Sequence, residues 1–173
     1  LRSGQTETIT FTLSETSSNF AAGDITLSGG SIGTLTTTSS TVYSAVFTPT
    51  TNTNSGTGSI SVAGATFTDA LGNDNAASTA LSISYDTAAP TVTITRAGSG
   101  TLKSGQTETV TFTLSEASSD FASGDITLSG GSIGTLTTTS STVYSVVFTP
   151  TTNTQTGTGS ISVAGATFTD ALG

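Results

Sequence analysis

Acidic side chains are the groups in this sequence that could do chemistry. The chain holds 11 Asp and Glu against three Lys and Arg, and it has no His or Cys. Carboxylates, with amide and backbone carbonyls, are the ligands of Ca²⁺, which takes about six to eight oxygens. Zinc sites rely on His and Cys, and Mg²⁺ favours octahedral sites that keep several waters. The composition therefore favours Ca²⁺.

The acids are concentrated in segments with the composition of turns and linkers, and only Glu7 and Glu108 lie elsewhere. In a sandwich domain these segments share the end at which the chain enters. Like charges gathered there repel unless a cation neutralises them. We therefore predict calcium ligands at both entry ends: Asp86, Glu116, Asp125 and Asp170 in the second half of the chain, and Glu15, Asp24, Asp69, Asn73 and Asp74 in the first. The alternative is that they are solvated turn residues, because Asp and Asn cap turn backbone.

Other chemistries fit the sequence poorly. Glu15 with Asp24 resembles a glycosidase carboxylate pair, but no aromatic-lined cleft is indicated around it. A net charge of −8 with three basic residues excludes a phosphate-binding surface for nucleic acid. No run of 18 apolar residues is present, so no membrane span is expected in this segment. We predict that the protein is not an enzyme and has no small-molecule substrate.

The elements that must position these acids come in two copies. Residues 1–72 return as residues 102–173, a period of 101 residues, with eight substitutions. A period near 100 residues is the size of one small domain, so the chain is a tandem array of whole domains. Near-identical domains in series favour a spacer, whose function is length.

Each copy has the pattern of short β-strands. In residues 8–13, Ile9, Phe11 and Leu13 alternate with threonines, which predicts a half-buried strand. Similar runs recur between turn signals rich in Gly, Asn and Asp. About seven short strands in 101 residues are typical of an immunoglobulin-like (Ig-like) sandwich. The predicted fold is all-β: two tandem Ig-like Greek-key β-sandwich domains, arranged end to end.

Pro90 sets the domain boundary, because proline cannot donate to a ladder and so begins a strand. Residues 1–86 are then an Ig-like repeat with strands B to G and without strand A. Residues 87–173 are a repeat with strands A to F and without strand G. A longer array of repeats explains why each of these two repeats lacks one strand. The alternative is that neighbouring chains donate the missing strands head to tail.

The sequence of both copies resembles the bacterial Ig-like repeats of giant surface adhesins, of the RTX and biofilm-associated kind. The resemblance rests on Leu114-Ser115-Glu116, Phe148-Thr149-Pro150 and Phe67-Thr68-Asp69 followed by Gly72-Asn73, and it covers nearly the whole chain. It implies a secreted, cell-surface stalk that carries an adhesive tip and is stiffened by calcium. Its partners are then neighbouring repeats of the same long chain.

Two further functions remain open at this point. One is a glycan- or surface-binding Ig-like module, which would need an exposed aromatic platform or a concave polar site. The other is a subunit of an extracellular fibre held together by strand complementation and head-to-tail self-association. The stalk with Ca²⁺ at domain junctions is the main prediction.

Overall fold

The computed structural model describes residues 1–172, which fall into two compact units, Leu1–Ala88 and residues 89–172. Strands and two short 3₁₀ helices make up the regular structure. No helix in the described part of the chain is long and apolar enough to cross a membrane.

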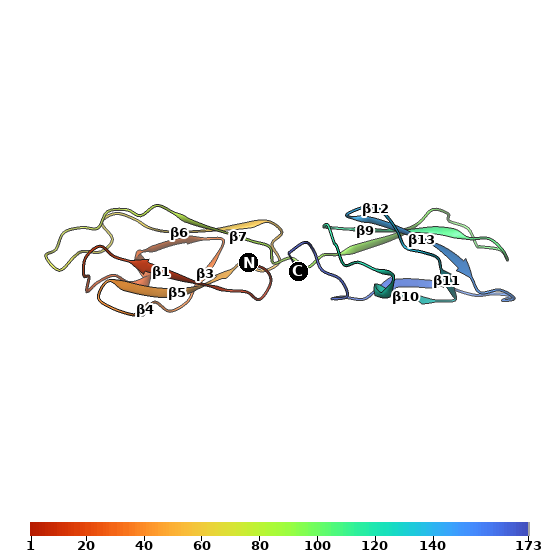
Figure 1. Ribbon diagram of the computed structural model, residues 1–173, viewed down its shortest axis with the longest axis horizontal. Helices are drawn as coiled ribbons and strands as arrows, with labels where there is room; N and C mark the ends of the chain where they lie inside the picture. The colour runs from red at the N-terminus through yellow and green to blue at the C-terminus, as the bar shows by residue number, and fades with distance from the viewer. Residues whose placement is uncertain (173) are drawn as a thin grey trace. The chain divides into compact units, whose positions relative to one another are not determined.

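The first unit is built from two antiparallel sheets that lie in two layers (Figure 1). One sheet has the order β1-β5-β3, with β4 also on β5, and the other has the order β2-β6-β7. The elements are β1 (Glu7–Thr12), η1 (Ala22–Asp24), β2 (Ile25–Ser28), β3 (Gly30–Ile32), β4 (Thr36–Thr37), β5 (Val42–Pro49), β6 (Gly56–Val62) and β7 (Leu81–Tyr85).

The second unit repeats this plan with one strand gained and one absent among its described residues. Its sheets have the orders β11-β13-β9-β8, with β12 also on β13, and β10-β14. The elements are β8 (Val92–Arg96), β9 (Glu108–Leu114), η2 (Ser123–Asp125), β10 (Ile126–Ser129), β11 (Gly131–Ile133), β12 (Thr137–Ser140), β13 (Val143–Pro150) and β14 (Ser160–Val163).

The sheet orders are those of an Ig-like sandwich, because the chain moves repeatedly from one sheet to the other. In the first unit β2 pairs with β6, whereas the next strand, β3, pairs with β5 of the other sheet. The predicted all-β, Ig-like fold in two tandem domains is confirmed.

The core of each unit follows the alternation seen in the sequence. Phe47 in the first unit and Phe112 in the second are fully buried. Threonines occupy the other face, where a β-branched side chain suits an exposed sheet surface. The alternation of apolar and polar residues along each strand therefore places the aromatic rings between the two sheets.

One aromatic cluster closes the end of each sandwich that carries the predicted calcium ligands. In the first unit Phe20 packs edge-on against Tyr43 and Phe67, with ring centroids 5.0 Å apart in both pairs. The Tyr43 hydroxyl donates a 3.0 Å hydrogen bond to the carbonyl of Ser17. The loop after β1 is thereby held against the core.

Candidate metal centre

Two loops meet at the acidic end of each unit: the loop after β1 or β9, and the loop after β6 or β14. In the first unit the Ser17 hydroxyl donates to the Thr68 carbonyl at 2.8 Å, and the Thr68 N–H donates to Asn19 Oδ1 at 3.1 Å. The second unit has Asp120 in the place of Asn19, and the Thr169 N–H donates to Asp120 Oδ1 at 3.0 Å. Each unit therefore holds its acid-bearing loops together by hydrogen bonds.

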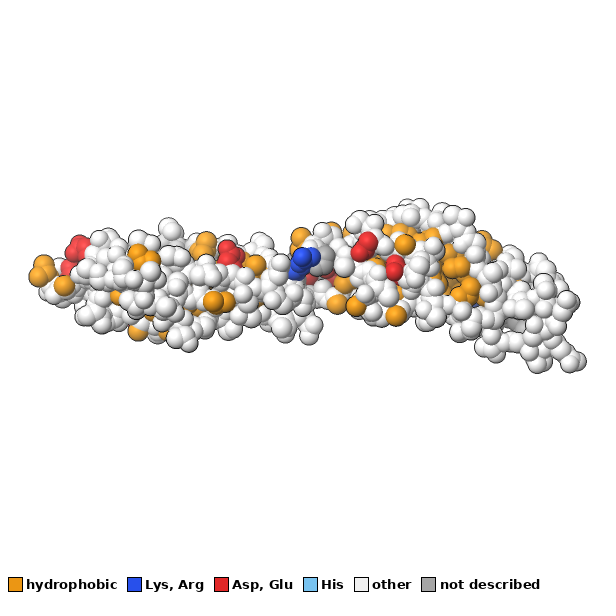
Figure 2. All heavy atoms as spheres, turned by 60° about the horizontal axis from the view of Figure 1, so that its bottom comes forward, with side chains coloured by type: hydrophobic (Ala, Val, Ile, Leu, Met, Phe, Trp, Pro, Cys, Tyr) orange, Lys and Arg blue, Asp and Glu red, His pale blue; other side chains and the backbone are white. Residues whose placement is uncertain are grey.

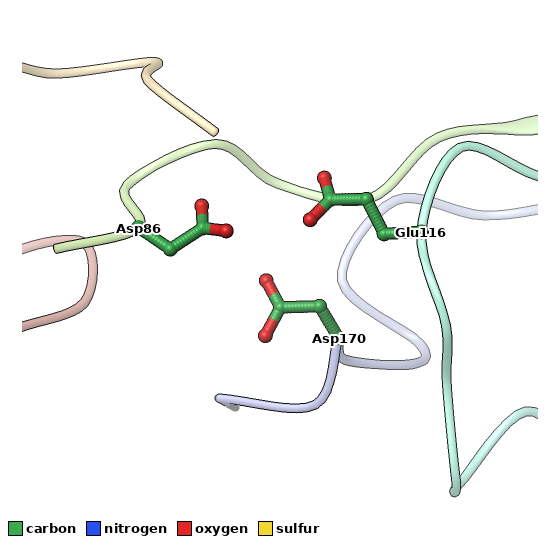
Figure 3. Close-up of side chains that lie close together, drawn as sticks. All are labelled: Asp86, Glu116 and Asp170. Carbon is green, nitrogen blue, oxygen red and sulfur yellow. The ribbon is translucent and has the colours of Figure 1, made fainter. Parts of the chain in front are cut away.

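Glu116 and Asp170 bring two carboxylates together within the second unit (Figure 3). Glu116 lies two residues beyond the end of β9, and Asp170 lies two residues beyond the buried Phe168. Each offers a carboxylate oxygen, and these oxygens lie within 4.8 Å of each other, with both residues half-buried. Two unit charges about 4 Å apart repel by about 1 kcal/mol in water and by several times more near a protein surface. This pair is suited to hold a cation.

Asp86 lies at the end of the first unit, on the segment that leads into the second. Its Oδ1 accepts the Ala88 N–H at 3.1 Å. Five residues later, Thr91 is fixed to the residue before Glu116: the Thr91 N–H donates to Ser115 Oγ at 2.8 Å, and the Ser115 N–H donates to the Thr91 carbonyl at 2.9 Å. Five extended residues span at most about 17 Å, which limits how far Asp86 can lie from Thr91.

Asp24 and Asp125, also predicted as ligands, have a local role in the structure. Asp125 Oδ2 accepts the Ala122 N–H at 2.7 Å, and Asp24 Oδ2 accepts the Ala21 N–H at 2.8 Å. Each carboxylate thus caps the start of a 3₁₀ helix, as a turn residue does. Asp125 does not join Glu116 and Asp170 in a close group among the described side chains.

The predicted ligands of the first unit line one open groove rather than a close cluster. Glu15, Asp69, Asn73 and Asp74 all border a groove of about 590 Å³. Asp69 Oδ1 accepts the N–H groups of Leu71 and Asn73, both at 2.8 Å, and its Oδ2 accepts the Asn73 side-chain amide at 2.7 Å. The Asn73 amide is the main cause that lowers the pKa of Asp69. Asp69 and Asn73 are therefore hydrogen-bonded to each other in this unit.

The exchange of Asn19 for Asp120 predicts different acid sensitivity in the two units. The Thr169 N–H, then the hydroxyls of Ser118 and Thr169, lower the pKa of Asp120 below the 3.8 of an unperturbed aspartate. A carboxyl with a lowered folded-state pKa stabilises the fold above its unfolded pKa, and this contribution is lost as the pH falls through the folded value. Below about pH 4, the second unit is therefore expected to lose stability. The Asp120→Asn variant is expected not to show this loss, because an amide does not titrate.

Asn19→Asp is the matched control, because it introduces the same titration into the first unit. Thermal unfolding of the chain between about pH 2 and pH 6 measures both effects. An unchanged pH dependence in both variants would contradict the assigned role of this side chain.

Sequence reasoning overlooked the ion pair at the other end of β9. Arg96 Nε lies 3.4 Å from Glu108 Oε2, and Glu108 is 9% exposed. Glu108 also accepts the N–H of Gly98, and the Arg96 guanidinium donates to the Gly98 carbonyl at 2.6 Å. The sequence held a signal for this ion pair: one strand ends with an Arg, and the next strand begins with a Glu.

The surface elsewhere is nearly uncharged. Figure 2 shows scattered acidic side chains and very few basic ones on a mostly white surface of uncharged polar groups and backbone. None of the eight Phe and three Tyr side chains is classed as exposed, and the chain has no Trp. An aromatic platform for sugar binding is therefore not present among the described residues.

Comparison with known proteins gives one result that covers the chain. The family model of the bacterial Ig-like domain matches twice, over residues 1–85 and 86–173. No curated protein and no solved structure matches the chain. The two matches lie on the two sandwiches, so the chain belongs to the bacterial Ig-like domain family as two domains in tandem.

Proposed function

We propose that this protein is a structural spacer from an extracellular bacterial surface protein of the adhesin type. The observation that carries the proposal is the repetition: two Ig-like domains of one family differ at eight of 72 equivalent positions. A spacer gains length from each copy, whereas a binding module would need an exposed aromatic platform, which the described residues lack. The nearly uncharged surface and the buried aromatic side chains agree with this function.

We further propose that Ca²⁺ binds to Glu116 and Asp170 and that Asp86 completes the site. Glu116 and Asp170 supply carboxylate oxygens within 4.8 Å of each other from two loops of one unit. Asp86 is tethered through Thr91 and adds a third carboxylate from the connecting segment. Because its ligands come from the connecting segment and from the second unit, a bound ion restricts the motion of that segment. In the adhesin this stiffens the stalk.

Calcium titration of the full chain tests the metal site. Binding to the folded state alone stabilises by about 2.7 kcal/mol when free Ca²⁺ is 100 times its Kd. For a domain of this size that corresponds to a rise in Tm of about 10–20 °C. We expect this rise for the second unit in calorimetry, its reversal by a chelator, and a broader distance distribution in small-angle scattering without calcium.

Variants separate calcium binding at this site from a response to calcium that does not depend on it. Glu116→Gln and Asp170→Asn are expected to remove the calcium response, and Asp86→Ala to weaken it and loosen the connecting segment while both units stay folded. Glu15→Gln, at the position equivalent to Glu116 in the first copy, is the control and is expected to leave the response of the second unit unchanged. Identical melting and scattering curves with calcium and with chelator would contradict the proposal.

A further inference from the structure

Thr87 is a buried polar residue in the segment that leads from the first unit to the second. It is 5% exposed and lies two residues beyond the end of β7. Its hydroxyl donates a 2.6 Å hydrogen bond to the Thr50 carbonyl and accepts a 3.1 Å hydrogen bond from the Thr53 N–H. The Thr87 N–H donates to the Thr53 carbonyl at 2.8 Å. Burying a hydroxyl is costly unless its hydrogen bonds are made, and here it both donates and accepts.

The loop that Thr87 contacts, residues 50–55 between β5 and β6, has an uncommon backbone shape. Asn52 and Ser55 have φ angles of 52° and 57°, in the left-handed region. Residues other than glycine seldom adopt this region, and they keep it where surrounding contacts stabilise it. The three hydrogen bonds between Thr87 and this loop are such contacts.

Packing holds the same part of the first unit. Tyr85, the last residue of β7, is 5% exposed and lies opposite Gly56, the first residue of β6. A Cβ atom on Gly56 would overlap the ring of Tyr85, so the ring lies directly on the glycine backbone. Tyr85 by packing and Thr87 by hydrogen bonds therefore fix the end of the first unit on either side of Asp86.

A second anchor lies in the second unit, where Thr91 and Ser115 exchange two hydrogen bonds at 2.8 and 2.9 Å. Between Thr87 and Thr91 the chain has only residues 88–90. Pro90 fixes its own φ, and it restricts Ala89 to extended backbone. Four residues of extended chain span at most about 14 Å. The free part of the connecting segment is therefore short and has few rotatable backbone bonds.

We propose that Thr87 is a latch that fixes the connecting segment to the first unit and confines backbone motion between the units to residues 88–90. The latch is the set of three hydrogen bonds that Thr87 makes to Thr50 and Thr53. All of these groups are uncharged, so the latch acts whether or not calcium binds. It goes beyond the proposed metal site, because it limits the joint of the spacer when no ion is present.

NMR of the full chain in excess chelator tests the latch separately from the calcium proposal. Backbone order parameters are expected near about 0.85 at Thr53, Thr87 and Thr91, as in rigid backbone. They are expected to fall below about 0.6 only at residues 88 and 89, since Pro90 has no N–H. A mobile run that extends over residues 86–91 in the original chain would overturn the proposal.

Thr87→Val removes the hydroxyl and keeps the branched shape of the side chain. Amide hydrogen exchange at Thr53 and at residue 87 is expected to become about ten- to a hundredfold faster, because buried hydrogen bonds are lost. The order parameters of Asp86 and residue 87 are expected to fall. Thr87→Ser keeps the hydroxyl and is expected to restore both values. A residue that only stabilised the fold would lower the melting temperature of the first unit without making this segment mobile.

Thr53→Val is the matched control, because the Thr53 hydroxyl donates to the Thr51 carbonyl in the same loop. It is expected to leave the connecting segment as rigid as in the original chain. Ser115→Ala opens the other anchor and is expected to mobilise Thr91 while Thr87 stays protected. The proposal is overturned if Thr87→Val behaves like the original chain in exchange and relaxation, or if Thr53→Val loosens the segment equally.

Discussion

Replacing Phe112 with alanine is expected to lower the free energy of unfolding of the second unit by about 3–5 kcal/mol. Its side chain is 0% exposed and lies in the core cluster of that unit, with its ring 5.7 Å from the ring of Phe121. The change removes the buried apolar surface and leaves a cavity, and both effects destabilise the fold. Urea unfolding monitored by NMR of each unit measures the loss.

Phe11→Ala is the matched variant in the first unit, and it is expected to cost clearly less. Phe11 occupies the equivalent position and packs against Phe20, but it is only half-buried because, among the described residues, β1 pairs on one side only and has an open edge. Part of its surface is already in contact with water, so its removal loses less transfer free energy. Equal losses in the two units would contradict this account of the open edge.

Replacing Gly29 with alanine is expected to destabilise the first unit by about 2–6 kcal/mol. Gly29 has a φ of +74°, which side chains adopt with strain, and it lies between β2 and β3, where the chain passes from one sheet to the other. A Cβ atom there would strike the Thr57 carbonyl oxygen and lie 2.8 Å from the Gly58 Cα. Backbone atoms cannot turn away as a flexible side chain can, so the strands themselves must separate.

Gly23→Ala is the control for this substitution. A Cβ atom on Gly23 meets nothing within 4 Å, and its φ is outside the positive region. It is expected to change the melting temperature of the first unit by a degree or two at most. Similar losses for Gly23→Ala and Gly29→Ala in calorimetry would show that the close approach of β6 at Gly29 has been misjudged.

The fold could be predicted from the sequence because the signals that define it are local. Alternation of Ile9, Phe11 and Leu13 with threonine defines a strand and its buried face over a few residues. The 101-residue period identifies the domain as the repeating unit. These features need no knowledge of which strand pairs with which.

The metal site stays a prediction, and the sequence alone could place its acids only in loops. The acids were correctly expected in loops, but their partners depend on loop paths that composition does not reveal. Glu116 and Asp170 are 54 residues apart in the sequence and meet because two loops fold over the same end of one sandwich. Asp125 was predicted as a ligand together with them, because it also lies in a turn segment, yet its carboxylate caps a 3₁₀ helix.

By itself, the sequence determined the strand content, the tandem repeat, the acidic balance and the absence of the residue types that zinc sites need. Only the tertiary structure decided that Glu7 and Glu108, which lie in nearly identical local sequences, differ in environment. Glu108 is buried against Arg96 from a neighbouring strand, whereas Glu7 lies at an open edge. The physical reason is that burial and ion pairing depend on which strand lies alongside in space, and a residue's own neighbours in the sequence carry no record of it.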